Sequence, residues 1–309
     1  MALIFHSTIK RDDWWRAEFA KHLPDLEVRF HPEIGNPDDI EFALCFNMPQ
    51  GELANFKNLK AIFSLGAGVD HFFNDPAFPK HIPLARVVDN ELASRMGEYV
   101  VQHVLNHHRD QIEYDRQQQG HVWEVRHPPA AKNRTIGIMG LGQLGIEAAK
   151  ALIGLGFNVT GWSRTAKNIE GVTSYAGDEQ LSTFLSNTEI LICLLPLTTK
   201  TENILNADLF AKLPQGAAII NPARGAHLVE ADLIAALDCG SLSGATLDVF
   251  RTEPLPEDDP LWSHPGIRIT PHVASIAAPD RVAALAAKNI IRARKGERLL
   301  NQVNPDKGY

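Results

Sequence analysis

The middle of the chain contains a glycine-rich turn between two short apolar segments, and this feature constrains the fold more than any other. Residues 135–165 read TIGIMGLGQLGIEAAKALIGLGFNVTGWSRT, with an apolar run at 136–139 before the turn and a helical pattern after it. The three glycines of the turn are Gly140, Gly142 and Gly145. The spacing G-x-G-x-x-G between a strand and a helix is typical of dinucleotide-binding βαβ units. The sequence therefore predicts a strand, a glycine turn, a helix and a second strand at 157–162.

Each glycine of this turn has a distinct physical role. Gly140 permits a tight turn, Gly142 lets the backbone approach a pyrophosphate group, and Gly145 lets the helix pack closely on the sheet. Gln143 and Leu144 lie at the start of the helix, whose N-terminus offers backbone N–H groups and a positive dipole end to phosphates. We therefore expect these five residues to bind a dinucleotide cofactor.

The end of the second strand predicts which dinucleotide is bound. NAD sites usually have Asp or Glu there, about 20 residues after the glycines, to bind the ribose 2′-hydroxyl. This chain has Ser163, Arg164 and Thr165 instead, followed by Lys167. A guanidinium can bind the 2′-phosphate of NADP through two parallel hydrogen bonds, whereas a carboxylate would repel it. We therefore expect NADPH to be preferred over NADH, with a solvated surface arginine as the alternative interpretation of Arg164.

Length, charge and cysteine content exclude several classes of protein. The 309 residues suggest about two domains. A net charge of −7 without a basic block argues against nucleic acid as a partner. Cys45, Cys193 and Cys239 form no C-x-x-C pair, so neither a disulfide framework nor a metal site is expected. The start of the chain reads as a strand and not as a signal peptide, and no apolar run approaches the ~20 residues that span a bilayer. We expect a cytoplasmic protein that binds neither metal nor membrane.

Two α/β series are expected along the chain. In the first, strands are predicted at 2–5, 27–30, 42–46, 60–64 and 84–87, and a helix at 11–22. One long helical segment, 94–118, and an irregular loop, 120–134, follow. After the glycine unit, strands are predicted at 190–195, 217–221, 245–250 and 267–270, with helices at 178–185, 230–237 and 279–295. Such alternation predicts parallel sheets covered by helices.

The nucleotide unit begins near the middle of the chain, and a helix remains after the second sheet is complete. The economical arrangement is a dinucleotide-binding domain, 98–275, inserted into a substrate domain made of 1–97 and 276–309. The two crossings between them, near 92–99 and near 271–279, are expected to act as a hinge.

Three polar segments follow successive strands of the second series. They contain Arg224 in 221–225, Glu253 in a loop bracketed by prolines, and His272 in TPHVAS. Ligands gather at the carboxyl ends of strands in open α/β sheets, and an arginine there suits a planar carboxylate. A histidine can transfer a proton near neutral pH, and a nearby carboxylate would orient it. Each residue alone has a structural alternative, but together, beside a dinucleotide turn, they predict one site.

A set of motifs over nearly the full length resembles the D-isomer-specific 2-hydroxyacid dehydrogenases. They are GAGVDH at 66–71, ELASRMGEYV at 91–100, GLGQLG at 140–145, CLLPLT at 193–198, NPARG at 221–225, LDVF-x-x-EPLP at 247–256 and TPHVAS at 270–275. The likeness is greatest to the glyoxylate/hydroxypyruvate reductase A subgroup, which shares WSRT and the terminal Gly308–Tyr309. The fold implied is α/β: two doubly wound parallel-sheet domains, with a Rossmann NAD(P)-binding domain inserted into a flavodoxin-like substrate domain.

The resemblance also implies a role for each site residue. Arg224 binds the substrate carboxylate and polarises its keto oxygen, His272 donates a proton to that oxygen, and Glu253 hydrogen-bonds His272 and favours its charged form. The backbone N–H groups around Ala67, Gly68 and Val69 complete the carboxylate site. The residues expected beside the cofactor, in addition to those above, are Leu195, Pro196 and Asp248; for Asp248 a structural role at its strand end is the alternative.

The activity implied is NADPH-dependent reduction of small 2-keto acids, chiefly glyoxylate to glycolate and hydroxypyruvate to D-glycerate. Another substrate, such as pyruvate or phenylpyruvate, stays open because Phe46–Asn47 replaces an aromatic pair of the subgroup. A dinucleotide-sensing binding protein is a third possibility, because the same fold serves transcriptional co-repressors.

Two further features bear on partners and metals. The loop 121–134, with Trp123, has the form of an arm that could cover the active site of a partner subunit, so a homodimer is expected. His103 and His107 are four residues apart on a helix but lack the glutamate of an H-E-x-x-H zinc site. We therefore interpret that helix as an interdomain or dimer helix, and Trp162 as a packing residue.

Overall fold

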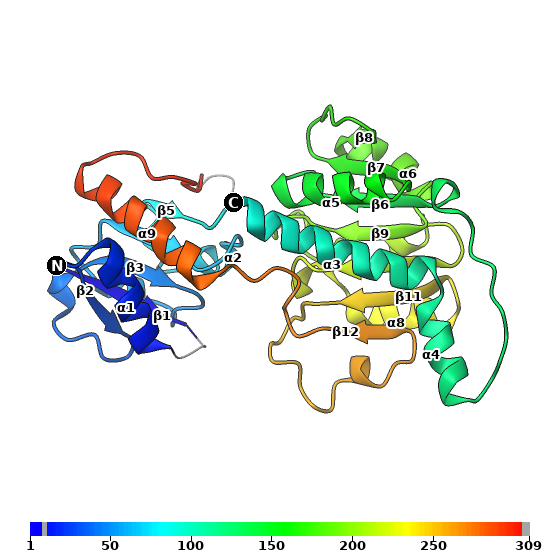
Figure 1. Cartoon of the computed structure of the whole chain (residues 1–309), viewed down its shortest axis with the longest axis horizontal. Helices are drawn as coiled ribbons and strands as arrows, with labels where there is room; N and C mark the ends of the chain where they lie inside the picture. Colours follow the sequence, from blue (N-terminus) through cyan, green and yellow to red (C-terminus); the bar gives the residue numbers. More distant parts are fainter. Residues whose placement is uncertain (8–10, 305–309) are drawn as a thin grey trace. The chain divides into compact units, whose positions relative to one another are not determined.

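The chain forms two compact units in the computed structural model, which describes residues 1–7 and 11–304 (Figure 1). Unit 1 consists of residues 1–90 and the segment from Ile276 onward, and unit 2 is Glu91–Ser275. The chain thus passes from unit 1 to unit 2 between Asn90 and Glu91, whereas the sequence predicted this boundary after residue 97. The roles of these units as substrate domain and dinucleotide-binding domain stay predictions. Gly308 and Tyr309, which contributed to the resemblance, lie outside the described residues.

Unit 1 is built on a parallel five-stranded sheet with the order β2-β1-β3-β4-β5. Its strands are β1 Ala2–His6, β2 Glu27–Phe30, β3 Ile40–Cys45, β4 Ala61–Ser64 and β5 Leu84–Ala85. Its helices are α1 Asp12–His22, α2 Asp70–Phe73 and α9 Pro279–Arg294, and two short 3₁₀ turns are η1 Pro37–Asp39 and η2 Glu52–Asn55. The central strands β1, β3 and β4 are mostly apolar because helices and loops cover both faces of the sheet, whereas the edge strand β2 carries Glu27 and Arg29.

Helix α9 returns late in the sequence to complete unit 1. It packs against α1 and β4 through one apolar face, which includes Val282, Ala286 and Ile290. Pro279 occupies the first turn, where the missing N–H has no helical partner in any case. The residues after it hydrogen-bond back to the sheet, because Val303 N donates to Leu84 O at 2.8 Å. Unit 1 is therefore discontinuous in sequence.

Unit 2 is built on a parallel seven-stranded sheet with the order β12-β11-β10-β9-β6-β7-β8. Its strands are β6 Thr135–Met139, β7 Asn158–Ser163, β8 Val172–Ala176, β9 Ile190–Cys193, β10 Ala217–Asn221, β11 Leu242–Leu247 and β12 Ile267–Ile269. Its helices are α3 Asn90–His108, α4 Gln111–Gln119, α5 Gln143–Gly154, α6 Gly177–Ser186, α7 Ala207–Phe210 and α8 Glu230–Asp238, with 3₁₀ turns η3 Ala131–Asn133, η4 Gly225–His227 and η5 Pro260–Trp262. The strand order reverses between β6 and β9, which is the switch point where such sheets bind ligands.

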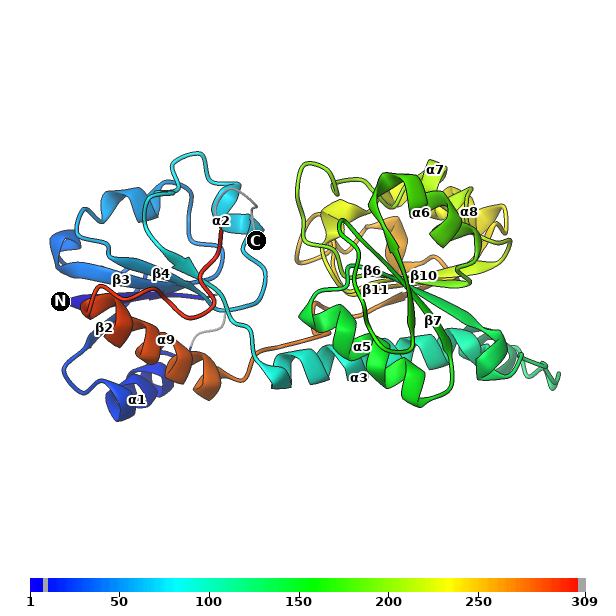
Figure 2. The ribbon, with the colours of Figure 1, turned by 90° about the horizontal axis from the view of Figure 1, so that it is seen from above.

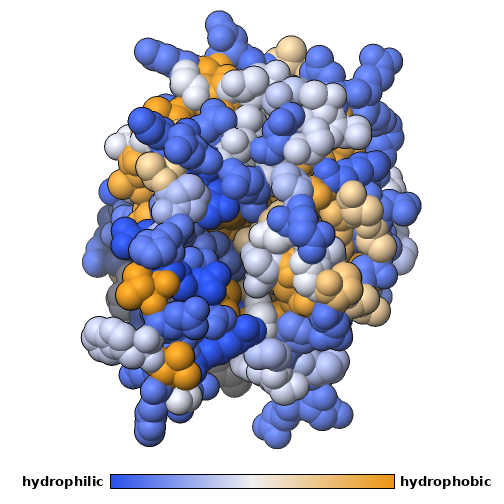
Figure 3. All heavy atoms as spheres, turned by 90° about the vertical axis from the view of Figure 1, so that its right-hand side faces the viewer, coloured by the Kyte–Doolittle hydropathy of each residue, from blue (hydrophilic) through white to orange (hydrophobic). Residues whose placement is uncertain are grey.

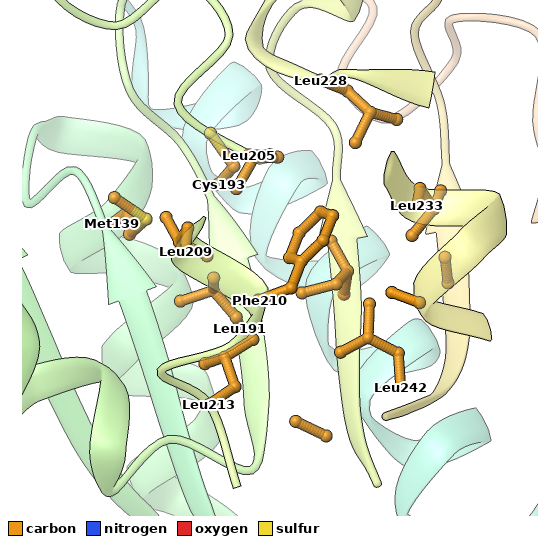
Figure 4. Packing of buried hydrophobic residues seen from close by; sticks show 14 of the residues in the cluster. Met139, Leu191, Cys193, Leu205, Leu209, Phe210, Leu213, Leu228, Leu233 and Leu242 are labelled. Carbon is orange, nitrogen blue, oxygen red and sulfur yellow. The ribbon is translucent and has the colours of Figure 1, made fainter. Parts of the chain in front are cut away.

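Helices cover both faces of this sheet (Figure 2). Helices α3 and α5 cover one face, where Val100 and Leu152 pack with Ile138. Helices α6, α7 and α8 cover the other face, and Figure 4 shows Phe210 packed among leucines of the strands and of α8. The outer surface drawn in Figure 3 is largely hydrophilic, with separate hydrophobic groups. The two doubly wound parallel sheets confirm the predicted fold class.

Two predicted elements of unit 2 were wrong in detail, and one strand was not predicted. The single helix 94–118 is broken into α3 and α4, because Asp110 adopts a left-handed backbone conformation with φ of +56°. Strand β8 was not predicted, since its sequence, VTSYA at Val172–Ala176, contains no apolar run, which agrees with its partial burial. The strand expected at 245–250 ends at Leu247 and begins at Leu242, so that Asp248 belongs to the loop after β11.

Among the described residues, none of the helices combines the length and the apolar character needed to cross a membrane.

Candidate active site

The carboxyl ends of the parallel strands in unit 2 gather most of the predicted residues at one edge of the sheet. The turn after β6 carries the glycines, the segment after β9 carries Leu195 and Pro196, and the segments after β10, β11 and β12 carry the three predicted charged or titratable side chains. The four strands from β9 to β12 are consecutive neighbours in the sheet. Their following segments therefore lie side by side, and the glycine turn lies next to the segment after β9.

His272 and Glu253 form a hydrogen-bonded pair at this edge. Nδ1 of His272 lies 2.7 Å from Oε2 of Glu253, and Oε1 of Glu253 accepts a hydrogen bond of 2.9 Å from the backbone N–H of Phe250. The side chain of His272 is 39% exposed to solvent, and that of Glu253 is 35% exposed. An ionised carboxylate only accepts hydrogen bonds, so Nδ1 of His272 carries a proton in this arrangement. Nε2 is then the ring atom that can exchange a proton with a ligand.

The charge of Glu253 is favoured by its neighbours. Burial raises the pKa of Glu253, but the hydrogen bonds from His272 and from Phe250 N–H lower it, and the pKa lies below its usual value. The charges of His272 and Arg224 act in the same direction. Arg224 is partly buried, and its Nη1 donates to Ala223 O at 2.7 Å. Arg224, Glu253 and His272 therefore form one interacting charged group within unit 2.

A close backbone approach places Arg224 beside the loop of Glu253. Gly225 lies so near Phe250 that a Cβ at this glycine would be 1.9 Å from the carbonyl carbon of Phe250. The turn itself is held by Asn221, whose Nδ2 donates to Arg224 O at 3.0 Å. Only glycine fits here, because both partners are backbone. The sequence motif NPARG is thus explained by packing as well as by its arginine.

Asp248 is fully buried and binds the segment that carries His272. Its Oδ1 accepts hydrogen bonds from Thr270 Oγ1 at 2.6 Å and from Val273 N at 2.9 Å, and its Oδ2 accepts one from Ala274 N at 2.9 Å. Burial raises the pKa of Asp248 in spite of these donors. The contacts support the structural alternative for this residue, and a direct role in cofactor binding stays a prediction.

The glycine turn fits a dinucleotide phosphate. Gly140 has a φ of +105°, and a Cβ there would lie 2.5 Å from Leu194 O, in the segment that leads to Leu195 and Pro196. A Cβ at Gly145 would lie 2.0 Å from Gly140 O, so that α5 could not pack closely on the turn. At Gly142 a Cβ would meet nothing within 4 Å.

The start of α5 adds to this fit. Helix α5 begins at Gln143, followed by Leu144, with no side-chain cap and no acidic residue in its first turn. The first and third glycines therefore shape the turn, while the second faces open space beside a helix N-terminus, as a bound phosphate requires. These residues can hold a dinucleotide.

The segment after β7 carries the predicted 2′-phosphate residues on the surface. Ser163 is buried, and its Oγ donates to Thr165 O at 2.8 Å, which shapes the turn. The side chains of Arg164, Thr165 and Lys167 are exposed. Residues 163–167 contain two basic residues and no acidic one. The local charge at this strand end therefore favours an anionic group.

The remaining predicted residues lie in unit 1. Ala67, Gly68 and Val69 form the loop after β4, and Ser64 Oγ donates to Gly68 O at 3.2 Å. Val69 is buried and precedes α2 directly. Arg86 Nη1 donates to Ala67 O at 3.4 Å. The part of these three residues in a carboxylate site stays a prediction.

A family profile and a curated relative show the ancestry of the chain. The profile described as D-isomer specific 2-hydroxyacid dehydrogenase, NAD binding domain, matches residues 101–274. A glyoxylate/hydroxypyruvate reductase A from Serratia proteamaculans is 43% identical over 315 residues, which covers 100% of both chains. The chain belongs to the D-isomer specific 2-hydroxyacid dehydrogenase family. The predicted family is thereby confirmed.

Solved structures of 2-hydroxyacid dehydrogenases agree with this membership over the whole chain. A D-isomer specific 2-hydroxyacid dehydrogenase from Xanthobacter autotrophicus, in complex with NADPH and MES, is 42% identical with a TM-score of 0.93, covering 100% of this chain and 99% of that one. An NADPH-dependent glyoxylate/hydroxypyruvate reductase from Sinorhizobium meliloti, in complex with NADP and sulfate, is 37% identical with a TM-score of 0.91, and the coverage is again 100% and 99%.

Some residues of this dehydrogenase that shape the site were not predicted. Thr270 and the backbone of Phe250 hold Asp248 and Glu253, and Gly225 permits the close approach of two loops. All three lie inside or beside motifs that the sequence already showed. Their place in those motifs could have marked them as residues of the site. Their contacts could not be predicted, because the loops that make them meet only in the folded chain.

The histidines of α3 lie within the packed body of unit 2. His107 Nε2 lies 3.0 Å from Thr246 Oγ1, and His103 packs its ring against Tyr99 at 4.2 Å between centroids. Within residues 1–7 and 11–304, no cluster of three or more His, Cys, Asp or Glu side chains is arranged to hold a metal ion. Trp162 is buried and donates from Nε1 to Gly177 O at 2.8 Å, in agreement with its interpretation as a packing residue.

Proposed function

We propose that this protein reduces small 2-keto acids, chiefly glyoxylate and hydroxypyruvate, with NADPH as the cofactor. The observation that carries the proposal is the Glu253–His272 pair beside Arg224, at the sheet edge that also carries the glycine turn. Relatives named glyoxylate/hydroxypyruvate reductase over the full length of the chain support the same activity. The products are glycolate and D-glycerate.

The charged group suits the chemistry of keto-acid reduction. NADPH, when bound, supplies the hydride that is added to the keto carbon. Negative charge then develops on the keto oxygen, and His272 transfers the Nε2 proton to it, so that the product is a 2-hydroxy acid. Arg224 opposes the same developing charge and binds the planar carboxylate of the substrate. Glu253 holds His272 with Nδ1 protonated throughout.

Cofactor choice is assigned to the segment after β7. We propose that Arg164 binds the 2′-phosphate, with Ser163, Thr165 and Lys167 around it, and that the backbone of the glycine turn holds the pyrophosphate. The basic character of residues 163–167 and the open space at Gly142 support this assignment.

The quaternary structure and the compartment are also proposals. The arm after α4 exposes Trp123, whose side chain is 97% accessible, together with Val122 and Val125. Exposed apolar side chains of this kind favour burial by a partner, so we propose a homodimer in which the arm covers the partner subunit. Three free cysteines fit a reducing cytoplasm. Sedimentation of the active protein tests the dimer, and a fully active monomer would contradict it.

Initial rates test the proposed activity. NADPH and NADH should be compared against glyoxylate, hydroxypyruvate, pyruvate and phenylpyruvate, with a reaction without keto acid as the background control. We expect NADPH oxidation with glyoxylate and hydroxypyruvate and much slower NADH oxidation. Tight NADPH binding without turnover of any keto acid would instead support a dinucleotide sensor.

The preferred keto acid depends on unit 1. At the end of β3, the ring of Phe46 lies against that of His71, with 4.7 Å between centroids, and Asn47 adopts a left-handed conformation. This aromatic surface differs from the pair expected in the subgroup. Faster turnover of phenylpyruvate than of glyoxylate would therefore reassign the substrate and leave the chemistry unchanged.

A further inference from the structure

The loop that carries His272 is hydrogen-bonded to helix α3 at both of its ends. At the start of the loop, Oη of Tyr99 lies 2.7 Å from Oγ1 of Thr270. At its end, Oγ of Ser275 donates to the backbone carbonyl of Leu92 at 2.6 Å. Helix α3 therefore holds both ends of this loop in place.

The direction of the first contact follows from its neighbours. Thr270 Oγ1 donates its hydrogen to Asp248 Oδ1 at 2.6 Å. A hydroxyl has a single hydrogen to donate, so Thr270 must accept from Tyr99. Tyr99 is 8% exposed, and burial raises its pKa, which keeps its hydroxyl protonated at neutral pH. Tyr99 is thus a permanent donor to Thr270.

Asp248 needs this donor more than an exposed carboxylate would. Its side chain is fully buried, and its carboxylate accepts hydrogen bonds from Thr270, Val273 N and Ala274 N. A buried charge that loses a hydrogen bond loses stability, because water cannot replace the missing donor. Fixing the Thr270 hydroxyl toward Asp248 therefore fixes the carboxylate to which the loop is bound.

The backbone of His272 and of the two residues after it depends on Asp248. His272 has a φ of +55°, a left-handed conformation that residues with a Cβ seldom adopt and that surrounding contacts must hold. Its N–H donates to Asp248 O at 2.8 Å, and the two following N–H groups donate to the Asp248 side chain. The direction in which the imidazole points is consequently set by Asp248.

We propose that Tyr99 is a positioning residue for His272. Its hydroxyl orients Thr270, and Thr270 orients the carboxylate of Asp248. This carboxylate holds the backbone of residues 273 and 274, directly after His272, so that the imidazole is directed toward Glu253 and the substrate. The inference rests on the proposed function of His272 as the proton donor. It gives helix α3 a part in proton transfer, although Tyr99 itself touches no reacting atom.

The variant Tyr99→Phe tests this inference because it removes one oxygen and keeps the ring that packs against His103. We expect the single-turnover rate of NADPH oxidation with glyoxylate to fall roughly 2- to 10-fold, the range that follows from losing one hydrogen bond. The Kd for NADPH should be unchanged. Since the assay is run well below the unfolding temperature, a purely stabilising hydroxyl would leave this rate unchanged.

Substitutions of Thr270 show whether Tyr99 acts through it. Thr270→Val should slow turnover, Thr270→Ser should retain most of the rate because it keeps the hydroxyl, and adding Tyr99→Phe to Thr270→Val should cause no further loss. The matched control is Tyr175→Phe. Tyr175 is a partly buried tyrosine of β8 that packs against Phe184 in the same unit.

Two results would contradict the inference alone. The first is a wild-type rate in Tyr99→Phe. The second is a double variant whose rate loss equals the product of the losses in Tyr99→Phe and Thr270→Val. Either result, obtained while the wild-type enzyme is active, would show that Tyr99 does not position His272 through Thr270. If the wild-type protein itself oxidises no NADPH with any keto acid, the proposed function fails, and the positioning role fails with it.

Discussion

At the scale of single residues, His272 bears directly on the proposed chemistry. Replacement by Asn removes the proton but suits the backbone, because Asn tolerates a positive φ better than most residues. We expect kcat of His272→Asn to fall by at least ~10²-fold, the lower range for general acid catalysis. Steady-state kinetics with glyoxylate measures kcat, and equilibrium titration with NADPH serves as the control for folding. Near-normal kcat would remove His272 from the proposed mechanism.

Arg164 determines the cofactor preference in our proposal. In Arg164→Ala we expect the KM for NADPH to rise roughly 10- to 100-fold, because one or two charge-assisted hydrogen bonds are lost, while the KM for NADH stays unchanged. The matched control is Lys150→Ala, which removes an exposed positive charge from α5. Equal changes of KM for both cofactors would contradict contact with the 2′-phosphate.

At the scale of elements, the site depends on how closely two loops meet. In Gly225→Ala the new Cβ would overlap the carbonyl of Phe250, so the loops that carry Arg224 and Glu253 must separate. We expect a loss of ~1–3 kcal/mol in the free energy of unfolding, as for other overpacked sites, together with a lower kcat.

The matched control for this substitution is Gly154→Ala near the end of α5, where a Cβ meets nothing within 4 Å. This change should be neutral or stabilise by up to about 1 kcal/mol, because alanine favours helix over glycine. Urea denaturation of both variants measures the difference. An unaltered Gly225→Ala enzyme would show that the two loops can move apart without loss.

The sequence could predict elements and motifs better than the contacts between loops. The strand–turn–helix pattern around Gly140 was local, so both its type and its position could be inferred. The helix break at Asp110 could not, because aspartate occurs within helices and its left-handed conformation depends on the surrounding fold. The hydrogen bonds of Asp248 were missed for a related reason: their donors lie more than twenty residues away in sequence.

At the scale of the whole molecule, two histidines of α3 make the stability of the fold depend on pH. Burial lowers the pKa of His107 to about 3 and that of His103 to about 4, from a usual value of 6.5. Such a histidine stays neutral in the folded protein, whereas in the unfolded chain it binds a proton below pH 6.5. The stability that it contributes is therefore fully present above pH 6.5 and is lost as the pH falls below that value. Between pH 7 and pH 5 each histidine should cost about 2 kcal/mol of stability.

The variant His107→Gln tests this dependence, because its amide can still reach Thr246 but does not titrate. We expect its free energy of unfolding to fall by about 2 kcal/mol less than that of the wild type between pH 7 and pH 5. Urea denaturation at the two pH values gives both numbers. The same pH dependence in variant and wild type would show that His107 binds its proton as readily in the folded state as in the unfolded chain.

The interrupted sequence of unit 1 has a consequence for how the protein matures on the ribosome. Unit 2 is encoded without a break, so it can complete its seven-stranded sheet once residue 275 has emerged from the ribosome. Unit 1 begins first but still lacks α9, whose apolar face covers α1 and β4. Unit 1 is therefore completed only after unit 2 has been synthesised, and the apolar surface of α1 and β4 stays uncovered until α9 has been made.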